Sequence, residues 1–127
     1  MEIRTGVDII EISRIKESIE QIGQVFLDRI YTEKEQEYCE KSNKMKYQHY
    51  AARFAVKEAF SKALGTGISG FNLQDVFITN DKDGKPKIHI QNNAKNILEN
   101  RCGECNVMVS LSHEKEFAIA FVVIECL

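Results

Sequence analysis

Residues 50–67, Y-A-A-R-F-A-V-K-E-A-F-S-K-A-L-G-T-G, decide the fold because they form most of one long predicted helix, residues 47–64. At about 100° per residue, small and apolar side chains gather on one side and mostly charged ones on the other. The apolar side holds Ala55, Val56, Ala59, Phe60, Ala63 and Leu64. The charged side holds Phe54, Lys57, Glu58, Ser61 and Lys62. Gly65 predicts the helix end, because glycine adopts the left-handed conformation of a C-terminal cap without steric penalty.

The charged side of this helix has two interpretations. Glu58 and Lys62 are one turn apart, and such a pair is usually a solvated ion pair that contributes about 0.3–0.5 kcal/mol. However, Phe54 lies in the middle of the charged side, which indicates that something covers it. Arg53 falls on the apolar side, where a cation needs an anionic partner. We therefore interpret this face as the wall of a site.

Composition limits the possible functions of the chain. Its 127 residues suit one domain, residues 1–127, and its formal net charge of -2 provides no general attraction to nucleic acid or membranes. No apolar run is long enough to span a bilayer, and the first residues lack the apolar region of a signal peptide. The chain has four cysteines, and we interpret Cys102 and Cys105 as incidental thiols in a turn. These features predict a cytoplasmic protein.

The chain reads as helices first and a strand meander last, which predicts an α+β fold with an antiparallel sheet packed against the long central helix. Ser13 is the expected cap of the first helix, and Thr32 with Glu35 forms a capping box for a later one. The sequence Asp83-Gly84 marks a hairpin turn. We expect strands at residues 1–12, 73–79, 85–90, 107–112 and 117–124, and helices at residues 13–22, 25–30, 32–41, 47–64 and 93–101. The last strand is almost wholly apolar, so we expect it to be buried on both faces, either within the monomer or against a partner subunit.

Three features outside the capping and turn signals are candidates for chemistry: Asp8, the pair of Glu58 and Lys62, and His113. Asp8 interrupts an apolar strand close to Gly6, whose missing side chain would let another group approach. Asp8 and Glu58 offer two carboxylates without histidine at ligand spacing, which suits Mg²⁺ and a phosphate substrate. A helix cap or an ion pair with Arg14 is the alternative for Asp8. His113 ends the run S-L-S-H and, without further context, is a surface turn residue.

Two motifs resemble the signatures of the 4'-phosphopantetheinyl transferases. Residues 6–14, G-V-D-I-I-E-I-S-R, resemble the first signature, and residues 54–62, F-A-V-K-E-A-F-S-K, resemble the second. Their spacing, the chain length, the G-T-G-I run after the second motif and the closing S-L-S-H run are similar to the small bacterial type, the holo-acyl-carrier-protein synthases. The resemblance extends over nearly the whole chain.

This resemblance implies a transferase that moves the phosphopantetheine arm of coenzyme A onto a serine of an apo-acyl carrier protein. The other product would be adenosine 3',5'-bisphosphate. Asp8 and Glu58 would hold Mg²⁺ against the pyrophosphate, and Lys62 would neutralise or protonate the departing phosphate. The base would be Glu58 or a metal-bound water positioned by Asp8.

The resemblance also implies the binding residues. Coenzyme A would contact Arg53, Lys57, Gly65, Gly84, Lys85, Pro86, Ser112 and His113. Among these, Arg53 and His113 are candidates for the 3'-phosphate, and residues 84–86 would lie along the adenine. Arg14 and its helix would meet the carrier protein, although Ser18, Gln21 and Gln24 depart from the more basic pattern of the family. The small members are homotrimers whose active sites are shared between subunits.

Two other functions use the same residues. A Mg²⁺-dependent hydrolase of a nucleotide pyrophosphate would need a positioned water and no protein acceptor, and the exposed face around Arg14 favours it less. A non-catalytic binding module would leave Glu58 and Lys62 as a surface ion pair and Asp8 as a cap. In such a module Mg²⁺ would change nothing.

Overall fold

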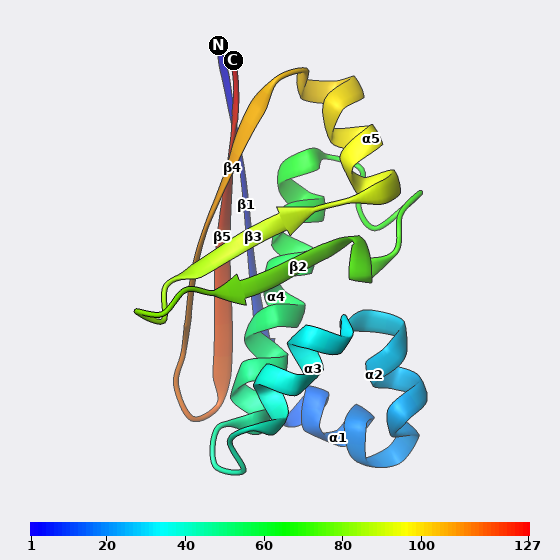
Figure 1. The fold of residues 1–127 in the computed structure, drawn as a ribbon, viewed down its shortest axis with the longest axis vertical. Coiled ribbons are helices and arrows are strands. Elements are labelled where there is room, and N and C mark those ends of the chain that lie inside the picture. The colour runs from blue at the N-terminus through cyan, green and yellow to red at the C-terminus, as the bar shows by residue number, and fades with distance from the viewer.

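Helix α4, Lys46–Leu64, is the central element of the computed structural model, which describes residues 1–127. A three-stranded sheet runs alongside α4, and a two-stranded hairpin crosses in front of both (Figure 1). The sheet has the order β1 (Glu2–Glu11), β5 (Phe117–Cys126), β4 (Cys105–His113), and both strand pairs are antiparallel. The hairpin pairs β2 (Val76–Asn80) with β3 (Pro86–Ile90). The expected α+β architecture is confirmed.

Short helices cover the two ends of α4. Its first half lies beside α1 (Ile12–Ile22), α2 (Gln24–Ile30) and α3 (Glu33–Glu40). The 3-10 turn η1 (Leu73–Asp75) and α5 (Asn92–Cys102) lie toward the other end, as Figure 1 shows. The buried apolar side chains form two clusters, one around the first half of α4 and helices α1–α3, the other between the second half, β5 and the hairpin.

Gly6 determines how closely β1 approaches α4. A Cβ atom at Gly6 would lie 2.0 Å from the carbonyl oxygen of Ala59 and 2.6 Å from the backbone nitrogen of Ala63. The helix backbone therefore occupies the space that any side chain at this position would need. The sequence indicated that Gly6 admits a close neighbour, and that neighbour is α4 itself.

Several local signals agree with the structure. Thr32 and Glu35 form the complete capping box at the start of α3. Gly65 ends α4 in the left-handed conformation with φ 87°. Ser13 does not cap α1, because that helix begins one residue earlier, after Glu11, without a side-chain cap. Leu73 lies in η1 and not in a strand, so β2 starts three residues later than expected.

Within one chain, the last strand is buried on one face only. Every second side chain of β5 from Ala118 to Ile124 packs toward α4, whereas Phe117, Ile119 and Phe121 remain 39%, 41% and 44% exposed. The register places Phe121 beside Val7 and Ile119 beside Ile9 on β1. We call this surface the outer apolar face, and it consists of Ile3, Val7, Ile9, Met108, Phe117, Ile119 and Phe121. The apolar run of β5 therefore has a core side and an exposed side.

Candidate active site

Asp8 and Lys62 form a direct ion pair between β1 and α4. The Nζ of Lys62 donates to Asp8 Oδ1 at 2.9 Å and to the carbonyl oxygen of Val7 at 3.0 Å. The side chain of Asp8 is 16% exposed and that of Lys62 is 53% exposed, so the pair faces solvent from the lysine side. Asp8 is neither a helix cap nor a partner of Arg14. The close contact at Gly6, two residues earlier, brings the two elements together.

Glu58 completes this group. Burial and then the negative charge of Asp8 raise the pKa of the half-buried Glu58 carboxyl, while Lys62 acts in the opposite direction. The effect of Asp8 means that the two carboxylates lie close enough to interact through space. Lys62 pairs with Asp8 and makes no ion pair with Glu58, so the simple one-turn salt bridge is absent. Asp8, Glu58 and Lys62 therefore make one cluster, as the sequence predicted for a site wall.

The donors in this cluster suit a hard cation that shares a phosphate ligand. No group of three or more histidine, cysteine, aspartate or glutamate side chains gathers anywhere in the chain in a way that could hold a metal alone. Mg²⁺ commonly binds through one or two carboxylates and takes its remaining ligands from water and substrate phosphates. Asp8 and Glu58 fit that mode of binding, because burial and then the negative charge of Asp8 raise the pKa of Glu58, and a cation would offset both effects.

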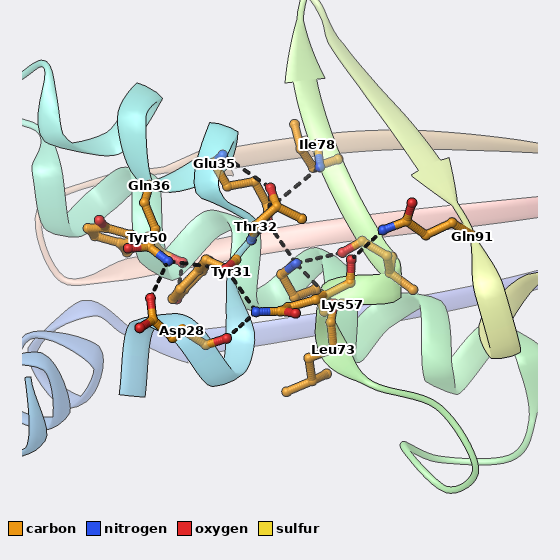
Figure 2. Close-up of polar contacts among 12 residues, drawn as sticks. Asp28, Tyr31, Thr32, Glu35, Gln36, Tyr50, Lys57, Leu73, Ile78 and Gln91 are labelled. Carbon is orange, nitrogen blue, oxygen red and sulfur yellow. Dashed lines mark hydrogen bonds and ion pairs between the residues drawn. The ribbon is translucent and has the colours of Figure 1, made fainter. Parts of the chain in front are cut away.

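Lys57 does not lie on the exposed charged side of α4. Its Nζ donates to Glu35 Oε1 at 2.9 Å and to the carbonyl oxygens of Leu73 at 3.1 Å and Val76 at 2.5 Å (Figure 2). Burial lowers the pKa of Lys57, and the carboxylate of Glu35 opposes that shift. All three donors of the ammonium group are taken by the protein. We therefore correct the expectation that Lys57 binds coenzyme A, because it instead ties α4 to α3 and the hairpin.

Ser61 is the second residue that periodicity placed on the wrong side. It is buried, and its hydroxyl donates to the carbonyl oxygen of Glu58 at 2.7 Å. Because Lys57 and Ser61 are both buried, the exposed charged side narrows to Glu58 and Lys62 with the partly buried Phe54. A helical wheel cannot predict this, because it assumes that one side of the helix is free.

Arg53 is 2% exposed and has no carboxylate partner in an ion pair. Its guanidinium carbon lies 4.2 Å from the centre of the Tyr38 ring, and its Nη2 donates to Asn80 Oδ1 at 2.6 Å. Its Nε has no hydrogen-bond partner. The expected anionic partner is therefore not part of this chain, and a buried cation in that condition favours binding of an anion.

Asn80 connects Arg53 to the hairpin turn. Its Nδ2 donates to the carbonyl oxygen of Gly84 at 3.1 Å while its Oδ1 accepts from Arg53. Gly84 has φ 85°, which is the left-handed conformation expected at this turn, and the exposed Lys85 and half-buried Pro86 follow it. The sequence did not indicate Asn80, since an asparagine at a strand end is normally read as part of a turn.

The remaining predicted residues are spread over the surface. Ser112 and His113 at the end of β4 line a pocket of about 290 Å³. Arg53 lines a different pocket of about 210 Å³, and Lys85 with Pro86 lines a third. Gly65 lies beside Arg4 and Arg101, both of which donate to the carbonyl oxygen of Leu64. Arg14 is exposed on α1. One chain thus brings Asp8, Glu58 and Lys62 together but does not gather the predicted coenzyme A ligands in one pocket.

His49 is a residue that the sequence did not indicate. It lies one turn before Arg53 on α4, and its ring centre is 6.1 Å from that of His113 and 5.1 Å from that of Tyr38. The spacing of four residues between His49 and Arg53 was the available signal, because such residues share one side of a helix.

Known proteins resemble this chain over nearly its whole length. A model of the 4'-phosphopantetheinyl transferase superfamily matches residues 4–122. The holo-[acyl-carrier-protein] synthase of Ruminiclostridium cellulolyticum is 46% identical, covering 98% of this chain and 92% of that protein. The one from Chloroherpeton thalassium is also 46% identical, covering 97% of this chain and 98% of that protein.

Solved structures of holo-[acyl-carrier-protein] synthases also resemble this chain over nearly its whole length. The holo-[acyl-carrier-protein] synthase from Neisseria meningitidis has a TM-score of 0.85 at 36% identity, covering 96% of this chain and 97% of that one. The Bacillus anthracis enzyme, in complex with CoA (3',5'-ADP), has a TM-score of 0.79 at 37% identity, covering 98% of this chain and 96% of that one. None of the helices described above is long and apolar enough to cross a bilayer. None of these matches supports the hydrolase or the binding module. The chain belongs to the 4'-phosphopantetheinyl transferase superfamily, among the holo-[acyl-carrier-protein] synthases.

Proposed function

We propose that this chain, as one domain over residues 1–127, transfers 4'-phosphopantetheine from coenzyme A to a serine of apo-acyl carrier protein. The observation that carries the proposal is the cluster of Asp8, Glu58 and Lys62, within the 4–122 range that matches the family. The solved relative from Bacillus anthracis, in complex with CoA (3',5'-ADP), supports coenzyme A as the donor.

The reaction forms one bond and breaks one bond at phosphorus. The serine oxygen attacks the pyrophosphate phosphorus next to the pantetheine, and the bond to the bridging oxygen breaks to release adenosine 3',5'-bisphosphate. We propose Glu58 as the acceptor of the serine proton, because its carboxylate lies beside Asp8 in this cluster. Lys62 stabilises the charge that develops on the departing phosphate, and Asp8 holds the ammonium group in place.

Asp8 and Glu58 are our proposed ligands for Mg²⁺. When bound, this ion would neutralise charge on the pyrophosphate. The support is the oxygen-only donor set and the repulsion between two neighbouring carboxylates. In the apo chain Lys62 supplies part of that compensation, because its Nζ lies 2.9 Å from Asp8 Oδ1.

We further propose a homotrimer in which two subunits complete each site. The outer apolar face leaves Val7, Ile9, Phe117, Ile119 and Phe121 between 39% and 62% exposed, which favours association with other copies. Among the predicted coenzyme A ligands, Ser112 and His113 line one pocket of the chain, Arg53 lines a second, and Lys85 and Pro86 line a third. A second subunit would bring such groups together on one ligand.

The exposed Arg14 on α1 is our proposed contact for an acidic carrier protein. The exposed location is consistent with a surface encounter in which added salt weakens binding. We place the enzyme in the cytoplasm, in keeping with four cysteines that are all free thiols.

Intact-mass spectrometry of an apo-acyl carrier protein tests the transfer. The carrier is incubated with coenzyme A and this protein, with and without Mg²⁺. We expect a gain of one phosphopantetheine that needs both the protein and the metal. If coenzyme A is cleaved while several apo-carriers keep their mass, the chain is a hydrolase and the proposal is wrong.

A further inference from the structure

Four planar side chains form a continuous row beside the first half of α4. His113 at the end of β4 lies edge-on to His49, with ring centres 6.1 Å apart and planes at 85°. His49 lies edge-on to Tyr38 of α3 at 5.1 Å, and the guanidinium of Arg53 lies over that ring at 4.2 Å. Three groups able to carry positive charge thus lie along one row, two from α4 and one from β4.

This row has no negative charge to balance it. None of the ion pairs in the chain involves Arg53, His49 or His113. The only hydrogen bond of Arg53 goes to the neutral amide of Asn80, and its Nε has no partner. On the neighbouring surface, two lysines and one glutamate line the same pocket as Arg53 and Tyr38: Lys34, Lys41 and Glu37. A buried arginine with an unpaired donor and two adjacent imidazoles is an arrangement suited to an anion.

The pKa of His49 reflects both its burial and its positively charged neighbours. Burial, then Arg53 and then His113 lower the pKa of His49 below its ordinary value, and no carboxylate acts against them. The free protein therefore keeps His49 neutral near pH 7. A phosphate placed in the row would supply the missing negative charge and would favour the protonated imidazole.

We propose that His49 is a third member, with Arg53 and His113, of the site for the terminal phosphate of the substrate, and that it takes up a proton when this phosphate binds. The inference rests on the proposed function, because it takes coenzyme A as the phosphate-bearing ligand. His49 would then determine specificity for the 3'-phosphate by adding a charge only when that phosphate is present. A ligand without the phosphate would not raise the pKa of His49, so the imidazole would stay neutral.

The sign of the pH dependence follows from linkage. Binding raises the pKa of His49, so the complex holds more protons than the free protein, and affinity falls as pH rises through the pKa of the complex. One linked proton changes affinity by at most about tenfold per pH unit. The second ionisation of the phosphate, near pH 6, acts in the opposite direction and is the same for every variant. Facing His49 are Arg53 on its own helix, His113 on β4 and Tyr38 on α3.

The test is isothermal titration calorimetry of coenzyme A and of 3'-dephospho-coenzyme A in two buffers with different ionisation enthalpies. The variant is His49→Phe, which keeps an aromatic ring between Tyr38 and His113 but cannot be protonated. His89→Phe is the matched control. His89 stacks on Phe77 at 4.9 Å on the hairpin, and its Nε2 shares a hydrogen bond with the Thr79 hydroxyl at 2.7 Å, so Phe keeps the stacking and loses only that bond. Circular dichroism checks each fold, and His49→Gln replaces His49→Phe if the latter does not fold.

We expect the wild type to take up a fraction approaching one proton when coenzyme A binds at pH 7, and very little with 3'-dephospho-coenzyme A. The Kd for coenzyme A should rise about three- to tenfold between pH 6.5 and 8. His49→Phe should lose this uptake and most of the pH dependence, with kcat at saturating coenzyme A unchanged, while His89→Phe behaves as the wild type.

Equal proton uptake in the wild type and His49→Phe, alongside normal modification of apo-acyl carrier protein, would overturn this inference and leave the proposed function intact. Failure of the wild type to bind coenzyme A or to modify any apo-carrier would overturn the proposed function, and the inference with it.

Discussion

At the scale of single residues, the ion pair of Asp8 with Lys62 joins β1 to α4 at the candidate site. The sequence indicated both residues as candidates, together with Glu58, but it offered Arg14 and not Lys62 as a partner for Asp8. The two residues are 54 positions apart, and only the approach of α4 to Gly6 makes them neighbours. Lys57 was misplaced because its burial depends on Glu35, a residue of another helix.

Substitution of Glu58 by glutamine is the first prediction at this scale. Glu58→Gln should keep the fold and slow transfer by at least about a hundredfold, because it removes both a proton acceptor and a negative metal ligand. Transfer rates across a Mg²⁺ titration measure this effect, and thermal melting is the control. A variant with the wild-type rate would remove Glu58 from the site.

The pKa of Glu58 in the metal-free chain is a second prediction for this residue. Burial and then Asp8 raise this pKa, so without Mg²⁺ it should lie above the ordinary glutamate value of about 4.3. NMR titration of the Glu58 carboxyl carbon measures it. Asp8→Asn removes one cause of the shift and should move the titration midpoint downward. An unmoved midpoint would contradict the coupling between the two carboxylates.

Lys62 should matter more for the chemical step than for binding. Lys62→Ala removes the charge that faces the departing phosphate, so kcat should fall by about tenfold or more while the Kd for coenzyme A changes less. Single-turnover transfer and calorimetry separate the two quantities. Lys95→Ala is a suitable control, because Lys95 is an exposed lysine on α5. If kcat is unchanged and only Kd rises, Lys62 is a binding residue.

At the scale of elements, helices and strands were predicted well because their signals are local. The capping box at Thr32, the glycine end of α4 and the hairpin at Gly84 depend on a few adjacent residues. The sequence predicted less well which side of each helix or strand is buried, because burial depends on neighbours that are distant in the sequence. Alternation along β5 could not be seen in a run where both sets of side chains are apolar, so its exposed side was missed.

The contact of β1 with α4 predicts a large effect for one methyl group. Gly6→Ala places a Cβ 2.0 Å from a backbone oxygen of α4, so the strand or the helix must shift. We expect a loss of about 3 kcal/mol or more in the free energy of unfolding, at the upper end of the range for overpacking. Urea denaturation measures it, and Glu17→Ala, at an exposed position of α1, should change stability by less than about 0.5 kcal/mol. A small loss for Gly6→Ala would mean that the two elements separate easily.

At the scale of the whole molecule, the outer apolar face is the feature that one chain leaves incomplete. It joins β1, β4 and β5 on the side of the sheet opposite α4. The sequence indicated burial of β5 either inside the monomer or against a partner, and the structure assigns only half of its side chains to the monomer core. The sequence could not predict that the proposed coenzyme A ligands line different pockets of one chain, because their positions depend on how distant elements pack.

A charge on this face should therefore disrupt the proposed trimer. Phe121→Asp and Ile119→Asp place carboxylates where association would bury them without a partner. Light scattering should give the mass of a monomer for these variants and of a trimer for the wild type. Ile22→Asp is the control, because Ile22 is 57% exposed at the end of α1, away from the sheet. A monomeric wild type would contradict the proposed assembly.

The contacts of Glu35 predict which parts of the molecule unfold together. Its carboxylate accepts hydrogen bonds from the amide of Thr32, at the start of α3, and from the amide of Ile78, in β2, and it also holds Lys57 (Figure 2). The end of a helix and the middle of a hairpin thus share one acceptor, although the two amides are 46 positions apart in the sequence. Amide hydrogen exchange should report Thr32 and Ile78 opening as one cooperative unit, and a helix end that would fray freely in isolation should be protected as well as a strand interior.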